Sequence, residues 1–425
     1  MSRYRYSAVI ILTLFLSSCS NFLTWHLDRG IHAASNTDSQ ELLTREPLAS
    51  DSKNNALTNI NLQIDIIYNK SINSGISGNS GYLHMKKINN ILYVVDTEGM
   101  LSGVDSNNGK ILWSVDTNTE ISSGLSIIND SICLGSANAE LLCYKLDSAE
   151  SNKYTPLISS LSNLTSFSEY NPDVKIQLLT ELASPIQSIN NLLLLKLDND
   201  DLYLIDPDNN DVIWKSESQN IPLRSKGASS PMIIDNNIII ARDNGSVASY
   251  NAVDGTLKWF TIISSRSGRN DLESQRDAEM DPIVSDKMLF YGHYQGELNA
   301  LDISTGDIIW ASPFSFINDV IINENSLYGS TSDNLIVSID KASGFINWKD
   351  SVDDSILTEP FLIKDLLLVF STTGKLYVYD KNEGNKIFED NLDFDLHPQT
   401  SFILDKDKVY FFTADGDIVH LKITI

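Results

Sequence analysis

A nine-residue phrase that recurs about every forty residues constrains the fold of this chain more than any other feature. The phrase has Asp at its first position, Gly at its fifth and Trp at its ninth, as in Asp302, Gly306 and Trp310. Complete copies also begin at Asp105 and Asp340, and copies with one changed position begin at Asp206, Asn251 and Asp380. A fixed period of this length indicates a propeller or a solenoid, in which neighbouring repeats bury one another's apolar faces.

The residues around the phrase are typical of short strands joined by turns. Each copy follows a run that alternates apolar and polar residues, such as 374–380, and a second apolar run, such as 366–370, lies further upstream. The Asp can accept hydrogen bonds from backbone N–H groups of the turn, and the Gly permits a positive φ. The strand that leaves the turn carries the Trp, which we expect to pack between units. Each unit is therefore interpreted as one four-stranded antiparallel propeller blade.

Counting the strand before the Asp gives eight units. They end at Asp105, Lys145, Asp206, Asn251, Asp302, Asp340, Asp380 and Lys422. The second unit is degenerate, because it has Lys145 where the others have Asp or Asn, and two long spacings predict insertions near 151–180 and 264–281. The eighth unit lacks a Trp-bearing strand, so we expect residues 60–70 to pair with 417–421 and close the ring without open sheet edges. The prediction is an all-β, eight-bladed β-propeller over residues 59–425.

The N-terminal residues are typical of a targeting signal. Arg3 and Arg5 precede a short apolar run, and 16–19 (Leu-Ser-Ser-Cys) resembles the bacterial lipobox. The resemblance implies a signal peptide over 1–18, a lipidated Cys19, sorting to the outer membrane and a polar tether over 19–58. The alternative is an ordinary signal peptide in which the cysteine is incidental.

Two further cysteines, Cys133 and Cys143, fall on consecutive strands of the degenerate second unit. A three-residue loop centred on Asn138 would place them opposite each other, whereas a loop of two or four residues would offset them. The sequence leaves two arrangements of these cysteines open. One is a disulfide, which an oxidising compartment permits, and the other is a pair of small buried thiols.

Composition and motifs argue against several functions. The net charge of −25 repels phosphate backbones, so nucleic-acid binding is not expected. The six histidines show no metal-ligand spacing, and no catalytic or phosphate-binding motif occurs. Residues 206–217 approach a calcium EF-hand loop, but Asp211 stands where the loop needs Gly, and the segment coincides with a repeat turn. We therefore expect neither an enzyme nor a metal or cofactor site.

The repeat resembles that of the pyrroloquinoline-quinone-type propellers, and the chain is similar within that group to the BamB-type lipoproteins of the outer-membrane β-barrel assembly machinery. The specific matches are the lipobox, the strand entry 227–231 (Gly-Ala-Ser-Ser-Pro) and the acidic stretch 276–284 followed by 294–302. The quinoprotein dehydrogenases of the wider group carry adjacent cysteines, which this chain lacks.

The resemblance implies a non-catalytic scaffold on the periplasmic face of the outer membrane. Its implied partners are the periplasmic domains of the barrel-inserting subunit, other lipoproteins of the complex and unfolded outer-membrane proteins. Two loops are implied to dock, one through Leu223 with Arg224 or Lys226 as its basic residue, and one through Asp277 and Glu279. The alternatives are that both loops are solvated turns of a generic periplasmic binding module, or that the propeller is a quinoprotein-type enzyme.

Overall fold

The computed structural model describes residues 62–72, 85–147, 155–156, 171–218, 229–264, 280–352 and 356–425. The chain divides into two units, 1–53 and 54–425, and all described residues belong to the second. Among the described residues, no helix has the length and apolar character that a membrane span needs.

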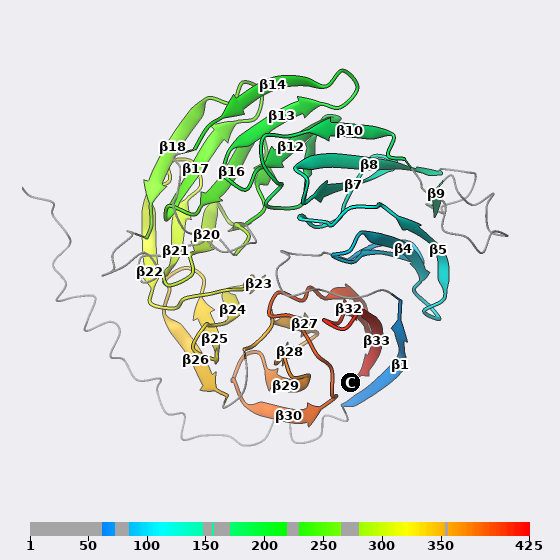
Figure 1. Ribbon diagram of the computed structural model, residues 1–425. Coiled ribbons are helices and arrows are strands. Elements are labelled where there is room, and N and C mark those ends of the chain that lie inside the picture. The colour runs from blue at the N-terminus through cyan, green and yellow to red at the C-terminus, as the bar shows by residue number, and fades with distance from the viewer. Residues whose placement is uncertain are drawn as a thin grey trace, which may run out of the picture. The chain divides into compact units, whose positions relative to one another are not determined.

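Across the described residues, the strands form eight antiparallel sheets arranged as the blades of a ring (Figure 1). Blade 1 contains β2 (Lys86–Ile88), β3 (Ile91–Val95), β4 (Met100–Asp105) and β5 (Ile111–Asp116). Blade 2 contains β6 (Ser126–Ile128), β7 (Ser131–Ser136), β8 (Glu140–Asp147) and β10 (Val174–Gln177), with β9 (Thr155–Pro156) also paired to β8. Blade 3 contains β11 (Gln187–Ile189), β12 (Leu192–Lys196), β13 (Leu202–Asp206) and β14 (Asp211–Ser216). Blade 4 contains β15 (Met232–Ile234), β16 (Asn237–Arg242), β17 (Ser246–Asn251) and β18 (Leu257–Ile262).

The second half of the chain repeats the same order. Blade 5 contains β19 (Ile283–Ser285), β20 (Met288–Gly292), β21 (Leu298–Asp302) and β22 (Ile308–Ser312). Blade 6 contains β23 (Ile321–Asn323), β24 (Ser326–Ser330), β25 (Leu335–Asp340) and β26 (Ile346–Ser351). Blade 7 contains β27 (Phe361–Ile363), β28 (Leu366–Phe370), β29 (Lys375–Asp380) and β30 (Lys386–Asn391). Blade 8 contains β31 (Ile403–Asp405), β32 (Lys408–Phe412), β33 (Asp417–Thr424) and β1 (Gln63–Ser71). The predicted eight-bladed propeller is confirmed.

The ring closes through β1, which comes from the opposite end of the chain. β1 pairs antiparallel with β33, with Gln63 opposite Thr424 and Ser71 opposite Asp417. The two strands lie side by side at the outer edge of blade 8 (Figure 1). The predicted closure by residues near 60–70 is confirmed, and it covers an edge of β33 that would otherwise expose unpaired backbone groups.

The repeated Asp and Gly make the turn after the third strand. In blade 5, Asp302 Oδ1 accepts hydrogen bonds from the backbone N–H of Ser304 at 2.8 Å and of Thr305 at 3.2 Å. Gly306 N donates to Asp302 O at 2.8 Å. The φ of Gly306 is +76°, which a residue with a Cβ rarely adopts. The repeat therefore encodes a hydrogen-bonded turn, as the sequence indicates.

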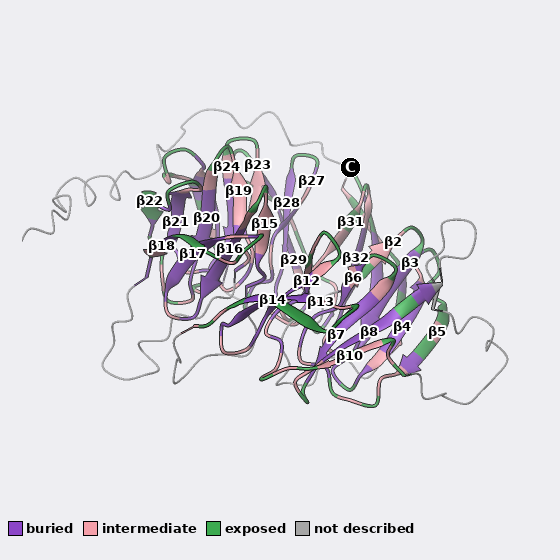
Figure 2. Cartoon of the chain, turned by 90° about the horizontal axis from the view of Figure 1, so that it is seen from above, coloured by how far each residue is buried: buried purple, intermediate pink, exposed green. Residues whose placement is uncertain are grey.

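Burial follows the position of a strand within its blade (Figure 2). Every residue of β3 and β28 is buried, because each of these strands is enclosed by neighbouring blades on both faces. The fourth strands lie at the outer edge of the ring and are mostly exposed, although in β18 Trp259 is buried while Leu257 and Phe260 are exposed. The long apolar runs of the sequence are thus buried middle strands, and so is the alternating run 374–380, which contains β29.

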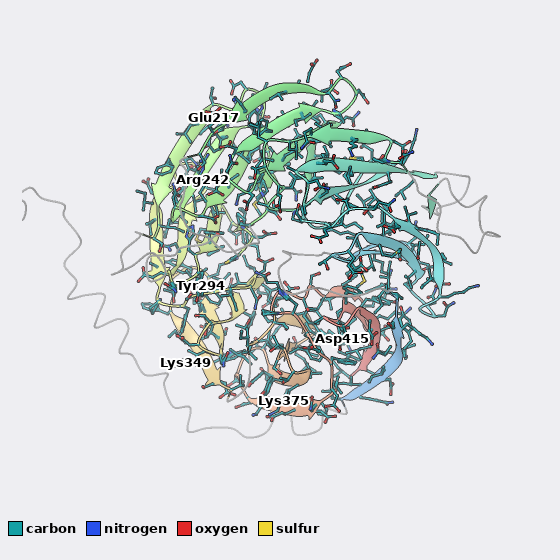
Figure 3. All side chains as sticks on the ribbon, viewed as in Figure 1. Glu217, Arg242, Tyr294, Lys349, Lys375 and Asp415 are labelled. Atoms are coloured by element: carbon teal, nitrogen blue, oxygen red, sulfur yellow. A yellow bond between two sulfur atoms is a disulfide. The ribbon has the colours of Figure 1, made fainter. Side chains whose placement is uncertain are left out.

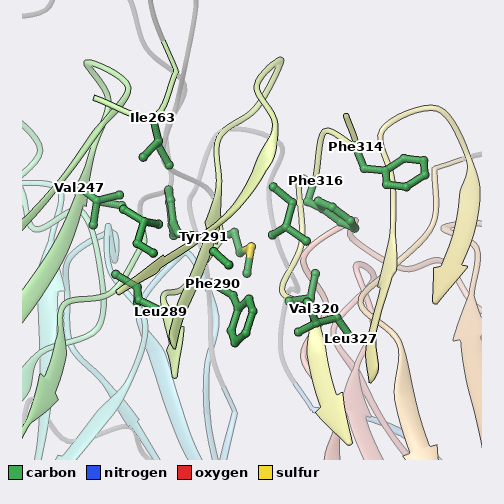
Figure 4. Close-up of a cluster of buried hydrophobic side chains, with 14 of the residues drawn as sticks. Val247, Ile263, Leu289, Phe290, Tyr291, Phe314, Phe316, Val320 and Leu327 are labelled. Atoms are coloured by element: carbon green, nitrogen blue, oxygen red, sulfur yellow. The ribbon is translucent and has the colours of Figure 1, made fainter. Parts of the chain in front are cut away.

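The tryptophans join successive blades. The indole N–H of Trp259 in blade 4 donates to the carbonyl of Ile303, the residue after the turn Asp of blade 5, at 3.0 Å. The same bond is made by Trp214 to Ala252, Trp310 to Lys341 and Trp348 to Lys381. A Cβ built on Gly306 would lie 2.5 Å from the Trp259 ring, so the turn Gly also makes room for the indole. The prediction that the tryptophans pack between blades is confirmed, and the apolar cluster of blades 4 to 6 extends across the seams of Trp259 and Trp310 (Figure 4).

Blade 2 departs from this pattern where its sequence is degenerate. β8 runs through Lys145 to Asp147 and pairs with β9. Within the part of the chain that the structure describes, the buried Nε1 of Trp113 in blade 1 has no hydrogen-bond partner. The region 151–180 is not all insertion, because it contains β10, the outer strand of this blade.

A disulfide joins Cys133 and Cys143 across β7 and β8. The two residues are directly opposite, because Ser136 pairs with Glu140 and the loop between them has three residues centred on Asn138. Of the two arrangements that the sequence leaves open, the structure has the disulfide.

Candidate functional site

The residues proposed for lipidation and docking fall on parts of the chain that the structure does not describe. Cys19 lies outside the described residues, and so do Leu223, Arg224, Lys226, Asp277 and Glu279. We call 219–228 the first docking segment and 265–279 the second docking segment. The structure shows the residues at which each segment leaves and rejoins the propeller, and these residues define the candidate site.

The first docking segment is anchored at both ends by polar contacts. At its start, the backbone N–H of Ser218 donates to Asp201 Oδ1 at 2.7 Å. At its end, the carbonyl of Ser229 accepts a hydrogen bond from Lys196 Nζ at 3.2 Å. Asp201 and Lys196 belong to blade 3, whereas Ser229 leads into blade 4. Two residues of blade 3 therefore hold the residues at either end of the segment.

Lys196 is a buried cation whose hydrogen bonds and charge are both satisfied. Its side chain is 0% exposed. Besides Ser229, Nζ donates to the carbonyl of Ala241 at 2.9 Å and forms an ion pair with Asp200 Oδ1 at 3.4 Å. Asp200 Oδ2 in turn accepts the backbone N–H of Asp243 at 2.9 Å. A buried charge is stable only when it is paired and hydrogen-bonded in this way, and removing one partner is costly.

The second docking segment leaves from blade 4 and returns to blade 5. At its start, the backbone N–H of Ser264 donates to the carbonyl of Gly245 at 3.0 Å. At its end, Met280 is 0% exposed and belongs to the apolar cluster of blades 4 to 6. Both ends are thus held by the folded part of the blades.

One hydrogen bond connects the ends of the two segments. The backbone N–H of Ser230 donates to Asp281 Oδ1 at 2.5 Å, across 51 residues of sequence. Asp281 is itself held from the next blade, because its backbone N–H donates to Asp319 Oδ1 at 2.6 Å. Blades 4, 5 and 6 are therefore linked in series through residues that lie two positions after each docking segment in the sequence.

Asp281 and Asp319 belong to a group of three carboxylates, which we call the entry carboxylates. Asp281, Asp319 and Glu359 each lie two residues before the first strand of blades 5, 6 and 7, respectively. Glu359 Oε1 accepts the backbone N–H of Phe402 in blade 8 at 3.1 Å. All three therefore accept a backbone N–H from the first strand, or its approach, in an adjoining blade.

The entry carboxylates titrate above their usual range. Burial raises the pKa of Asp281, although the Ser230 N–H and the charges of Lys196 and Lys86 oppose that rise. Burial also raises the pKa of Asp319 well above its usual value, and repulsion from Asp281 and Glu359 adds to the effect. Burial raises the pKa of Glu359 to about 7. The three groups are close enough to repel one another, so they form one electrostatic unit.

The described residues contain no group of three or more histidine, cysteine or acidic side chains placed to hold a metal ion. The EF-hand-like stretch 206–217 is the turn and outer strand of blade 3, as its place in the repeat indicates. Arg242, which lies within blade 4 (Figure 3), donates to the hydroxyl of Tyr250 at 2.6 Å and serves packing. The hydrogen bonds of the candidate site hold backbone segments of neighbouring blades in place.

Sequence reasoning missed Lys196, Asp281, Asp319 and Glu359. A signal for Lys196 existed, because a lone cation ends the run of four leucines at 192–195. The sequence also gave a signal for two of the carboxylates, because Asp281 and Glu359 each precede a Pro that leads into a predicted strand. Neither signal shows that the side chain reaches a neighbouring blade.

Comparisons with known proteins agree with this architecture. The sequence profile of the family described as "Outer membrane protein assembly factor BamB" matches residues 97–350 and 330–424. Proteins of that name from Legionella pneumophila (strain Paris) and Yersinia pestis are 31% and 22% identical to this chain. The alignments cover 37% of this chain and 42% of the Legionella protein, and 77% of this chain and 81% of the Yersinia protein.

The fold is also shared with a solved structure. The crystal structure of BamB from Moraxella catarrhalis superposes with a TM-score of 0.70 at 16% identity. The superposition covers 85% of this chain and all of the other. Because the family profile spans most of the propeller, the chain belongs to the BamB family of outer membrane protein assembly factors.

Proposed function

We propose that this chain is a lipid-anchored, non-catalytic scaffold of the outer-membrane β-barrel assembly machinery. It docks on the periplasmic domains of the barrel-inserting subunit and assists the insertion of unfolded outer-membrane proteins. Other lipoproteins of the complex are further partners. The family name describes an assembly factor, and this name supports the scaffold role that we propose.

The observation that carries the docking proposal is the hydrogen bond between Ser230 and Asp281, at 2.5 Å. Lys226 precedes Ser230 by four residues and Glu279 precedes Asp281 by two. An extended chain advances at most about 3.5 Å per residue, so Lys226 lies within about 14 Å of Ser230 and Glu279 within about 7 Å of Asp281. The covalent chain thus limits the basic and acidic docking residues to one neighbourhood of the ring.

Charge complementarity gives this neighbourhood a role in recognition. Arg224 or Lys226 on the first docking segment and Asp277 with Glu279 on the second present opposite charges from adjacent blades. Complementary charges on a partner would fix its orientation and speed association. Leu223 is the apolar neighbour of Arg224 in the sequence, and we propose that the two segments act together in docking.

A titration calorimetry experiment with the periplasmic domains of the barrel-inserting subunit tests the docking. Asp277→Lys combined with Glu279→Lys is expected to weaken binding at least about tenfold, since charge pairs at such surfaces are typically worth 1.5 kcal/mol or more. The free energy of unfolding should change little, because exposed charges contribute little to folding. Unchanged affinity would remove the two segments from the interface.

A matched control variant carries the same charge change elsewhere. Asp208→Lys combined with Asp211→Lys alters two exposed carboxylates at the turn before and the start of β14, whereas the first docking segment follows the end of that strand. This variant should bind like the native chain. Equal losses in both double variants would mean that net charge, and not the docking surface, controls binding.

The membrane association that we propose depends on Cys19. Acylation of this residue would place the propeller in the periplasm on the inner face of the outer membrane, at the end of the tether over 19–58. Metabolic fatty-acid labelling of Cys19→Ala tests this. Labelling should be lost while the propeller still folds, and labelling at the native level would contradict the anchor.

A further inference from the structure

His420 is a buried titratable side chain at the seam where β1 closes the ring. It lies on β33, is 3% exposed, and is directly opposite Tyr68 of β1 and Tyr410 of β32. Its ring stacks on that of Tyr410 with the centroids 4.4 Å apart, and it meets the ring of Tyr68 in a T-shaped arrangement at 5.2 Å. The imidazole is thus enclosed between the strand that closes the ring and the strand on its other side.

The position of His420 carries an uncharged residue in the blades that keep the repeat. In each of these blades it is the third-strand residue opposite the Trp or Phe of the fourth strand. The residues are Gly103, Leu204, Ser249, Ala300, Ser338 and Val378. Compared with these six blades, a titratable group at this position is particular to the seam that the N-terminal strand closes.

The nitrogens of His420 are buried without hydrogen bonds. Within the part of the chain that the structure describes, neither Nδ1 nor Nε2 has a partner. A neutral imidazole has one donor and one acceptor, whereas the charged form has two donors and a charge. The ring face of Tyr410 attracts a cation, but it offers neither N–H an acceptor, so the charged form is the more costly one to bury. Burial accordingly lowers the pKa of His420 to about 4.

The charged groups around His420 do not reverse this preference. The titratable and charged residues on the strands and turns around it are Lys408 and Tyr410 of β32, Asp405 of β31, Asp407 of the turn between them, Tyr68 and Lys70 of β1, Lys87 of β2, Asp105 of β4 and Lys422 of β33. After burial, repulsion from Lys408 lowers the pKa of His420 further, while Asp407 and Asp405 oppose the shift. Asp405 is paired with Lys87 at 2.9 Å and Asp407 lies 3.9 Å from Lys422, so both carboxylates are shared with a lysine.

We propose that His420 makes the closure of the ring sensitive to pH, because its protonation favours release of β1 from β33 and opens the propeller at this seam. Among the described strands, β1 pairs with β33 alone, and it is the first strand of the propeller in the sequence. Release of β1 removes Tyr68 from the imidazole and gives water access to its nitrogens. This inference goes beyond the proposed function and does not depend on it.

The direction of the effect follows from the two pKa values of His420. Its pKa is about 4 in the closed ring and 6.5 when the side chain is exposed. The released state therefore binds the proton more tightly than the closed state. The stability that neutral His420 gives the closed seam is fully present above pH 6.5 and is lost as pH falls through 4.

The test follows hydrogen–deuterium exchange of the full chain at pH 7 and pH 5. Rates are expressed as protection factors, which remove the intrinsic effect of pH on exchange. Amides of residues 68–71 report the closing seam, and amides between β17 and β18 report a reference seam in blade 4. From pH 7 to pH 5, protection should fall about tenfold at the closing seam and stay within about twofold at the reference seam. An NMR titration of the His420 ring should place its pKa near 4, well below the exposed value.

Two variants assign the response to this side chain. His420→Leu removes the titration and places at this position the residue that blade 3 has there, Leu204. Its closing seam should be equally protected at pH 7 and pH 5. His397→Gln is the matched control, because burial also lowers the pKa of His397, which lies between β30 and β31. It should respond to pH like the native chain. If His420→Leu does not fold, His420→Gln replaces it, since Gln is uncharged at both pH values.

Three results would overturn the proposal. The first is a closing seam whose protection in the native chain is the same at pH 7 and pH 5. The second is a response that persists in His420→Leu, because another group would then cause it. The third is an equal loss of protection at the closing and reference seams, which would show general unfolding in place of local release.

Discussion

The hydroxyl of Tyr68 donates a hydrogen bond to the carbonyl of Ser106 at 3.1 Å, and this contact is the ring-closing equivalent of the tryptophan bonds at the four seams between blades 3 and 7. Tyr68 lies opposite His420 on β33, at the place where Trp259 lies opposite Ser249 in blade 4. Ser106 follows the turn Asp105 of blade 1, as Ile303 follows Asp302 in blade 5. A tyrosine from the N-terminal strand thus makes at the last seam the bond that a tryptophan makes at those four seams.

Tyr68 should stabilise the closed ring by both its ring and its hydroxyl. Tyr68→Phe is expected to lower the free energy of unfolding by about 0.5–1.5 kcal/mol, the net value of one hydrogen bond. Tyr68→Ala should cost about 3–5 kcal/mol, because it also removes a buried aromatic ring that contacts Gly109. Urea unfolding measures both. Ile67→Ala, a half-exposed neighbour on β1, should cost less than about 1 kcal/mol, and a Tyr68→Ala cost in that range would contradict the ring-closing role.

The tryptophan seams should show the same division between ring and N–H. Trp348 is 7% exposed and donates to the carbonyl of Lys381 at 2.9 Å. Trp348→Ala should cost about 3–5 kcal/mol, and Trp348→Phe roughly 1–2 kcal/mol for the unpaired carbonyl and the smaller ring. Trp113→Phe is the comparison, because Nε1 of Trp113 has no partner among the described residues. In urea unfolding it should cost less than Trp348→Phe, and a larger loss would show that the indole bond is unimportant.

Glu359 should make the stability of the propeller depend on pH. Burial raises its pKa in the folded chain to about 7, above the value of 4.5 expected when it is unfolded. The folded state therefore favours the protonated form of Glu359. The stability that Glu359 contributes is fully present below pH 4.5 and is lost as pH rises through 7. Glu359→Gln should remove this dependence and gain stability relative to the native chain as pH rises from 5 to 8. The gain is up to about 3 kcal/mol, at about 1.4 kcal/mol per pKa unit.

Thermal or urea unfolding across this pH range measures the effect of Glu359→Gln. Glu389 provides a comparison of opposite sign, since its hydrogen bonds to Lys375 and Lys386 hold its pKa below the usual value. Its contribution is present above its unfolded pKa and is lost as pH falls. Glu389→Gln should therefore lose stability relative to the native chain at neutral pH. A Glu359→Gln variant whose stability tracks the native chain at every pH would contradict the burial of that carboxylate.

The disulfide between Cys133 and Cys143 should stabilise the blade that lacks the repeated turn. It closes a short loop, with a sequence separation of 10. Closing a loop of this size is expected to contribute roughly 2–3 kcal/mol through the unfolded state. Urea unfolding with and without reductant should show this difference in the native chain and no difference in the Cys133→Ala, Cys143→Ala double variant. If the native chain were equally stable with and without reductant, the predicted stabilisation by the disulfide would be wrong.

The repeat made most of the fold predictable, because the turn Asp and Gly and the Trp each have a local reason to recur. Their regular spacing gives the blade count, and the missing last strand predicts the closure by residues near 60–70. The role of Tyr68 was not predictable, because it occupies the tryptophan position of a blade whose other strands lie at the opposite end of the chain. The roles of three further residues were not predictable for a similar reason, since the partners of Lys196, Asp281 and Asp319 come from other blades. The docking residues were inferred from resemblance, and they stay a prediction.

The most direct test of the central claim is recovery of partners from membranes. The full lipidated chain, carrying an affinity tag, would be purified from detergent-solubilised outer membranes, and the co-purifying proteins would be identified. The scaffold role predicts that the barrel-inserting subunit is recovered with the native chain and with Asp208→Lys, Asp211→Lys. It also predicts strongly reduced recovery with Asp277→Lys, Glu279→Lys. Absence of the barrel-inserting subunit from the native sample would contradict the proposed function, and equal recovery with both double variants would contradict the proposed docking surface.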